Sequence, residues 1–256
     1  GIFSPDAALL YAAENDYHSG RGVIGIYDAA RDFHRIGEFS SGGIGPHDLA
    51  LLPGGDVLVV ANGGIRTHPD YPRAALNLAE MRPNLSYVNR LNGTVEEVVS
   101  PPARWHQLSL RHLAVDAEGL VAVGCQFQGA RIDHPPLIAI HRRGSALRFA
   151  DLPPRLNRSL NNYIGSIAIG SGGVIAATAP RGNRAVFVDA ASGVCLGHAD
   201  LHDAGGVAAA GGLGSGFVLT GGGVFTSAAP NAGKAPITAA SPPGCDWDNH
   251  LLGFQA

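Results

Sequence analysis

The sequence has few charged side chains and few cysteines, and both shortages exclude classes of protein. Charged residues make up 15% of the 256 residues, and the formal net charge is −3 with the 11 histidines neutral. No basic field therefore exists to gather nucleic acid or an anionic membrane surface. Three cysteines, odd in number and far apart, exclude a disulfide framework and a Cys-x-x-Cys zinc knuckle. One long-range disulfide stays open, but ordinary buried or loop thiols are the simpler expectation.

Long hydrophobic runs and helical periodicity are also scarce. No apolar run approaches the roughly 20 residues that a membrane-spanning helix needs, and the longest runs, such as residues 57–61, have the length of strands. No signal peptide opens the chain, and residues 1–6 are typical of a strand that runs into a turn, so we expect a trimmed start. The one plausible helical turn is residues 77–82, which Pro83 ends.

What the sequence does contain is a repeated strand pattern. Short runs rich in Val, Ile, Leu and Ala alternate with Gly, Pro, Asn and Asp from end to end, and hydrophobic residues make up 45% of the chain. The units open at Asp48, His112, Ser166, Gly206 and His250, at intervals of 64, 54, 40 and 44 residues. Four strands for every 40 to 50 residues or so is typical of the blades of a β-propeller.

Outer hairpins support this interpretation. Residues 23–28 and 35–39 form one such pair of strands, and residues 185–189 and 194–198 form another around an Asp-x-x-x-Gly turn. A β-sandwich, the rival all-β fold, predicts shorter spacing and no repeat. We therefore predict one all-β propeller domain over residues 1–256, with about five blades and with its N-terminal strands truncated. The last inner strand, at His250, would then lack its blade partners.

Several segments resemble an uncharacterised bacterial propeller family, the domain of unknown function 1513, whose members are exported proteins with WD-repeat-like or YVTN-like blades. They are residues 14–17, 45–55, 60–69, 110–116 and 247–251, and the Asn-Gly-Gly-Ile-Arg-Thr-His-Pro block within the third is specific. The resemblance covers essentially the whole chain. It implies a seven-bladed ring, export by the twin-arginine route, a periplasmic location and an association with iron uptake. It implies no reaction and no cofactor.

Blade geometry predicts where polar chemistry gathers. The residues that open each inner strand and the loops between second and third strands should share one face of the propeller. Residues 14–16, 62–68, 126–128 and 181–184 are expected to be such loops, and the long insertion 65–83 is expected to form a lid or rim. The ligand-binding candidates on this face are Glu14, Asn15, His47, Asp48, Asn62, Arg66, His68, Arg111, His112, Gln126, Gln128, Arg181, Asn249 and His250.

Each candidate also has a structural interpretation. A histidine at a strand opening can bond a neighbouring blade, as the structural histidine of WD repeats does. Arg66 and Arg111 can pair with Asp48 or Asp248 across blades. Residues 62–64 can be a turn that requires a positive φ angle.

Four functions compete at the level of the sequence. The first is a non-enzymatic periplasmic protein that uses the polar face for a small anionic ligand or a protein partner. The second is a lactonase-like hydrolase or isomerase, with His47 as the general base and Arg66 or Arg111 stabilising an oxyanion. The third is a metal or haem site on His47, His112, His250 and Glu14, and the fourth is a purely structural domain. The pairing of His47 with Arg66 is the arrangement we expect for an anion.

Overall fold

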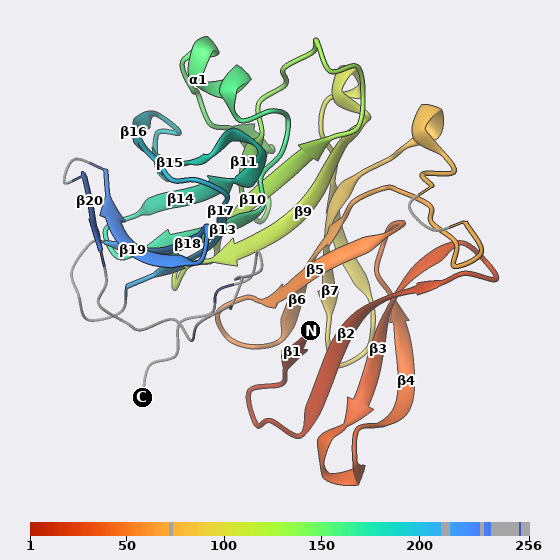
Figure 1. Ribbon diagram of the computed structural model, residues 1–256. Coiled ribbons are helices and arrows are strands. Elements are labelled where there is room, and N and C mark those ends of the chain that lie inside the picture. Colours follow the sequence, from red (N-terminus) through yellow and green to blue (C-terminus); the bar gives the residue numbers. More distant parts are fainter. Residues whose placement is uncertain (72–73, 211–215, 231–232, 237–250, 252–256) are drawn as a thin grey trace. The chain divides into compact units, whose positions relative to one another are not determined.

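The computed structural model describes residues 1–71, 74–210, 216–230, 233–236 and 251 of the chain. Its strands form five four-stranded sheets, each of which follows the order of the chain (Figure 1). The sheets consist of β1 (Ile2–Phe3), β2 (Leu9–Asp16), β3 (Arg21–Asp28) and β4 (His34–Ser40); β5 (Pro46–Leu51), β6 (Val57–Asn62), β7 (Asn84–Asn89) and β8 (Val95–Val99); β9 (Leu108–Val115), β10 (Leu120–Phe127), β11 (Ile138–Arg142) and β12 (Arg148–Phe149); β13 (Ser166–Gly170), β14 (Val174–Ala179), β15 (Arg184–Asp189) and β16 (Cys195–Asp200); β17 (Ala204–Ala209), β18 (Phe217–Gly221), β19 (Val224–Ala229) and β20 (Gly233–Pro236).

Helical structure is limited to short connections in the described part of the chain. They are the α-helix α1 (Pro154–Ser159) and the single 3-10 turns η1 (Ala29–Arg31), η2 (Leu78–Glu80), η3 (Ala103–Trp105) and η4 (Pro180–Gly182). The turn η2 confirms the helical turn expected near residue 78, and α1 was not expected. The all-β propeller fold is thereby confirmed, because the repeated unit is a four-stranded sheet.

The chain divides into two compact units. One comprises Gly1–Leu120, Phe127–Ala130 and Arg142–Leu147, and the other comprises Val121–Gln126, Arg131–His141 and Arg148–Ala256. Each unit has its own core. In the first, Tyr11, Ile24 and Ile26 of one sheet pack on Leu58 and Val60 of the next.

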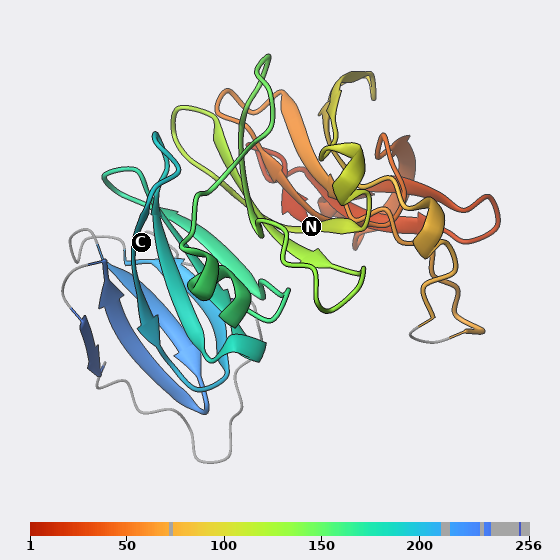
Figure 2. The same cartoon turned by 90° about the horizontal axis from the view of Figure 1, so that it is seen from above.

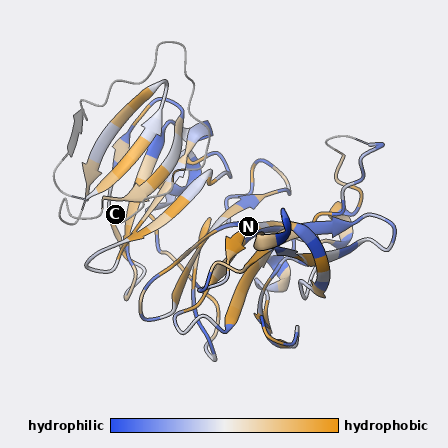
Figure 3. Ribbon diagram, turned by 90° about the horizontal axis from the view of Figure 1, so that it is seen from below, coloured by the Kyte–Doolittle hydropathy of each residue, from blue (hydrophilic) through white to orange (hydrophobic). Residues whose placement is uncertain are grey.

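The core of the second unit is built in the same way. Phe187 of the sheet β13–β16 contacts Phe217 of the sheet β17–β20, with ring centroids 5.8 Å apart. Figure 2 shows these two sheets side by side. Hydrophobic side chains are concentrated on the strands, and the connecting loops are more hydrophilic (Figure 3). The apolar runs that indicated strands in the sequence are therefore explained by the burial of one or both faces of each sheet.

Three expected loops are strand ends instead. Glu14 and Asn15 lie within β2, Asn62 is the last residue of β6, and Gln126 lies within β10. These strands continue further than expected because their backbones stay paired with the neighbouring strand, as Glu14 does with Val23. Asn62, for example, opposes Asn84 in the pairing of β6 with β7.

The insertion 65–83 leaves the end of β6 and closes on its own base. The side chain of Asn77 accepts a hydrogen bond from the Arg66 amide at 2.7 Å and donates to the Gly64 carbonyl at 2.9 Å. Gly64 has φ +75°, and a Cβ there would lie 2.6 Å from the Pro83 nitrogen. The positive φ that the sequence suggested for residues 62–64 is thus confirmed at Gly64.

Candidate functional site

The strongest polar grouping among the predicted residues joins the start of β5 to the middle of β9, because β9 begins at Leu108, four residues before His112, where the sequence indicated its opening. Both strands belong to the first unit. It consists of His47, Asp48, Arg111 and His112, which we call the strand-opening cluster. The Nη1 atom of Arg111 lies 3.0 Å from Nδ1 of His47. The rings of His47 and His112 meet edge to face, with centroids 5.0 Å apart and an interplanar angle of 77°.

Arginine chemistry fixes the proton on His47. A guanidinium carries only donors, so Nδ1 of His47 accepts the hydrogen bond and a neutral ring holds its proton on Nε2. The His47 side chain is exposed, whereas His112 is only 5% exposed. The cluster therefore contains hydrogen-bond donors of both Arg111 and His47.

Asp48 holds the two strands together. One carboxylate oxygen accepts from the Leu113 amide of β9 at 3.0 Å, and the other accepts from the Leu49 amide at 2.8 Å. Each oxygen is thus engaged by a backbone N–H, which is a strong arrangement for a carboxylate. Asp48 positions β5 against β9.

Asn62 is sealed inside the same unit. Its side chain is fully buried and donates to the Ser41 carbonyl, to Oδ1 of Asn84 and to Oγ of Ser86 at 2.9, 2.9 and 3.1 Å. Its own Oδ1 accepts from Oγ of Ser41 at 2.7 Å. The three acceptors share the two hydrogens of Nδ2, so every donor of this carboxamide is engaged, and the structure gives Asn62 a bracing role.

Glu14 belongs to an ionic ladder on the face of the first sheet. Its carboxylate accepts from the hydroxyl of Tyr27 and from Arg35 at 3.2 Å, and Arg35 also bonds Glu38 at 2.8 Å. The hydrogen bond to Glu14 raises the pKa of Tyr27 above its ordinary value, and the bond from Arg35 lowers the pKa of Glu38. Gly25 lies directly beneath the Glu14 carboxylate, which would have to shift to admit a Cβ there.

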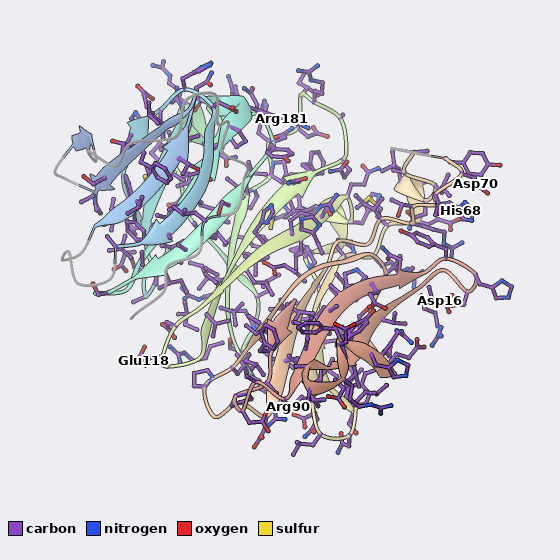
Figure 4. All side chains as sticks on the ribbon, turned by 60° about the horizontal axis from the view of Figure 1, so that its bottom comes forward. Asp16, His68, Asp70, Arg90, Glu118 and Arg181 are labelled. Atoms are coloured by element: carbon purple, nitrogen blue, oxygen red, sulfur yellow. The ribbon has the colours of Figure 1, made fainter. Side chains whose placement is uncertain are left out.

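Arg66 and His68 lie on the insertion, beside the turn between β2 and β3. The guanidinium of Arg66 packs over Gly20, where a Cβ would be 3.0 Å from it. The His68 ring meets the Tyr17 ring edge to face at 6.0 Å. Figure 4 shows His68 and Asp70 on this loop, near Asp16 at the end of β2. Asn15 lines a very small cavity of about 10 Å³ beside Arg66.

The printed contacts therefore pair His47 with Arg111, where the sequence suggested Arg66. No hydrogen bond between His47 and Arg66 occurs within the described residues. Arg111 was also a candidate, but which arginine faces His47 depends on how one inner strand sits beside the next. That register between sheets leaves no signal in a single sequence.

The remaining candidates lie apart from this cluster. Gln126 is buried and donates to the Ile164 carbonyl at 3.1 Å, and the Gln128 amide donates to the Gln107 carbonyl at 2.9 Å. Arg181 stacks 4.0 Å above the Tyr163 ring (Figure 4). Asn249 and His250, with the inner strand expected there, fall outside the described residues.

The described residues hold no group of three or more His, Cys, Asp or Glu side chains suited to a metal ion. His250, a member of the metal set suggested by the sequence, is not among them. A helix long and apolar enough to span a membrane is likewise not found in the part searched. Cys125 and Cys195 are both free thiols, and burial raises the pKa of Cys125 to about 12.

Five four-stranded sheets in chain order define a β-propeller protein. The chain belongs to the family described as "Protein of unknown function (DUF1513)", whose model matches residues 1–254. No curated protein matches the sequence.

Two solved structures are similar in fold. A chain of Kuenenia stuttgartiensis hydrazine synthase is 18% identical with a TM-score of 0.52, over 73% of this chain and 51% of that one. A chain in the crystal structure of the mitotic checkpoint complex is 13% identical with a TM-score of 0.62, over 93% of this chain and 62% of that one. The chain thus spans between half and two thirds of each. At these identities the likeness shows the fold alone.

Proposed function

We propose that this protein is a non-enzymatic binding propeller that holds a small anionic ligand at the strand-opening cluster. The observation that carries the proposal is the contact of Arg111 with Nδ1 of His47 at 3.0 Å. It brings a guanidinium from the middle of β9 and an Nε2 donor from the start of β5 together on two strands. Donors held on a rigid scaffold suit a carboxylate, which accepts charge-assisted hydrogen bonds.

Asp48 helps to hold the cluster in place. One oxygen of its carboxylate accepts from the Leu49 amide of β5, and the other accepts from the Leu113 amide of β9. These bonds fix β5 against β9. Binding to such a site is also favoured by preorganisation, because strands fix the donors before the ligand arrives.

The lactonase-like alternative gains no support from the contacts of His47. A general base needs a lone pair directed at the proton it removes. Here the Nδ1 lone pair accepts from Arg111, and a neutral ring then carries hydrogen on Nε2. His47 in this arrangement donates.

A periplasmic location and a role in iron uptake are part of the proposal on the family resemblance alone. An iron chelate that bears carboxylates would combine that role with the chemistry of the cluster. Fractionation of cells that produce the full-length protein tests the location: recovery in the periplasmic fraction supports it, and recovery with a cytoplasmic marker rejects it.

Calorimetric titration of the protein with citrate at low ionic strength tests the anion site. A hydrogen bond to a charged group contributes about 1.5–3 kcal/mol, so His47→Ala and Arg111→Ala should each weaken binding by about 10- to 100-fold. Arg111→Lys keeps the charge and loses the planar fork, so it should fall between. Arg31→Ala, an exposed arginine of η1, is the matched control.

Equal citrate affinity in all five proteins, or no binding to any, rejects the proposal. The lactonase-like alternative is tested by incubating the same proteins with a panel of lactones and measuring hydrolysis. Turnover that is lost in His47→Ala would replace the binding proposal with a catalytic one.

A further inference from the structure

We propose that the second unit contains a separate binding site for an organic anion with an apolar body, in a cavity between β16 and the segment that begins α1. The cavity has a volume of about 500 Å³, and Pro153, Arg155, Leu156, Arg184, Cys195, Leu196, Gly197 and His198 line it. A volume of this order is typical of sites for small ligands. None of the residues proposed for citrate binding takes part.

Strand pairing places the polar lining on one face. Arg184 of β15 opposes Asp200 of β16, Val186 opposes His198, and Val188 opposes Cys195. Because residues two apart on a strand share a face, Arg184, His198 and Cys195 project from the same side of the hairpin.

An irregularity in β16 shapes this face. The pairing shifts between Phe187 and Val188, so Leu196 is an extra residue in β16. The next residue, Gly197, has φ +143°, and a Cβ there would lie 2.9 Å from the Pro230 carbonyl. Bulges of this kind redirect side chains and are common beside binding sites. Here the bulge brings Leu196 to the cavity wall together with Cys195.

The segment before α1 supplies the opposite wall. The Asp151 amide donates to the Gly193 carbonyl at 2.8 Å, and Asp151 forms a parallel bridge with Val194. This contact holds the chain beside the start of β16. Pro153, Arg155 and Leu156 then follow along the cavity.

The charges of the lining have one sign. Arg155 and Arg184 are cationic, and no carboxylate is among the lining residues. Arg184 has an ion pair at 3.5 Å with Asp200, an exposed residue that is not part of the lining. Within the described residues, the side chains of Arg155 and His198 have no hydrogen bond or ion pair. Two arginines above Pro153, Leu156 and Leu196 fit an anionic head on an apolar body.

Cys195 provides a reporter inside the cavity, because its thiol is free and half-buried. The protein is alkylated with iodoacetate or with iodoacetamide, and peptide mass spectrometry follows Cys195 alone. Both reagents alkylate the same thiolate, but iodoacetate is an anion and iodoacetamide is neutral. The ratio of the two rates is therefore independent of the reactivity of the thiolate and depends on the local electrostatic potential. One unit charge about 7 Å away in water changes the concentration of a monovalent anion roughly threefold.

We expect the iodoacetate-to-iodoacetamide ratio to fall by about threefold in Arg155→Gln and in Arg184→Gln, and further in the double variant. Arg131→Gln is the matched control, since Arg131 is an exposed arginine of the same unit that does not line the cavity. Because the Arg155 side chain is exposed, its variant keeps the test valid even if Arg184→Gln impairs folding. His47→Ala should leave the ratio unchanged, which separates this site from the one proposed above.

A competition arm identifies the ligand class. Hexanoate should slow the reaction of Cys195 with neutral iodoacetamide, whereas acetate and hexylammonium should not. Equal rate ratios in the parent, Arg155→Gln and Arg184→Gln would overturn the proposal. Equal protection by hexanoate and hexylammonium would do so as well, because it would show an apolar cavity without preference for an anion.

Discussion

Replacing Asn62 by alanine tests whether this residue braces the fold or serves a ligand. Its carboxamide is fully buried and makes four hydrogen bonds, to groups of Ser41, Asn84 and Ser86. In the alanine variant the Ser41 carbonyl still accepts from the Ser86 hydroxyl, and the Asn84 amide still donates to the Gly42 carbonyl at 3.2 Å. The group left without its donor is Oδ1 of Asn84.

The cost follows from that orphaned carbonyl. An unsatisfied buried acceptor costs about 1–3 kcal/mol, and each lost hydrogen bond contributes about 1 kcal/mol net. Because the serine hydroxyls can rebond, we expect a total loss of about 3 kcal/mol in the free energy of unfolding. For a chain of this size that corresponds to a decrease in Tm of about 6–12 °C.

Thermal unfolding followed by circular dichroism measures the effect. Asn62→Asp keeps the shape but replaces the donor group by an acceptor, so it should be at least as destabilising at neutral pH. Asn92→Ala is the control, because exposed Asn92 loses only a local bond from the Thr94 amide at 2.9 Å. If Asn62→Ala melts within about 2 °C of the parent, the bracing interpretation is wrong.

Three further variants test other parts of the structure. Ile167→Asp should abolish cooperative folding, because Ile167 is 6% exposed and an unpaired carboxylate there costs several kcal/mol; Leu113→Asp, at a half-buried position, should cost clearly less in the same urea titration. Gly64→Ala should lower Tm by several degrees, since both its φ of +75° and the adjoining backbone exclude a Cβ; an unchanged melt would contradict that geometry. Arg35 lowers the pKa of Glu38 in the folded state, so stability from this contact is present above the ordinary value of 4.5 and lost as pH falls below it. Glu38→Gln should therefore lose less stability than the parent between about pH 6 and pH 3. An identical decrease in the free energy of unfolding of both proteins over this range would contradict the pairing.

The sequence predicted the sheets well because their pattern is local. Period-two alternation and Gly-rich turns mark strands wherever a sheet buries a face, and the hairpin of β15 and β16 matches the expected strands almost residue for residue. The pattern is less informative at Leu113, because its place in an apolar run favours the core but the residue is half-buried. In β9 the buried side chains include Leu110 and His112. A polar residue on a buried strand position defeats an assignment based on hydrophobic pattern.

The sites were harder to predict because they depend on contacts between segments distant in sequence. Arg155 lines the cavity beside β16 together with Arg184 and His198. No strand spacing and no motif in the sequence connects Arg155 to the other two residues. The bulge at Leu196 was also not predicted, although the sequence there shows a strand that contains a glycine. A signal did exist in the pair Leu196-Gly197, because glycine inside a strand often marks a bulge.

Polar residues at the strand ends of this propeller either stabilise the fold or are exposed for recognition. The difference depends on whether another segment of the chain covers the side chain. At the end of β6, Ser41 and Gly43 close over Asn62, and a Cβ on Gly43 would lie 2.6 Å from the Asn62 side chain. Glycine at position 43 thus lets the chain approach closely enough to seal the carboxamide. At the start of β5 the side chain of His47 is exposed and meets Arg111. Residues of the first kind should govern stability and those of the second kind recognition, so variants of Asn62 and His47 should affect different measurements.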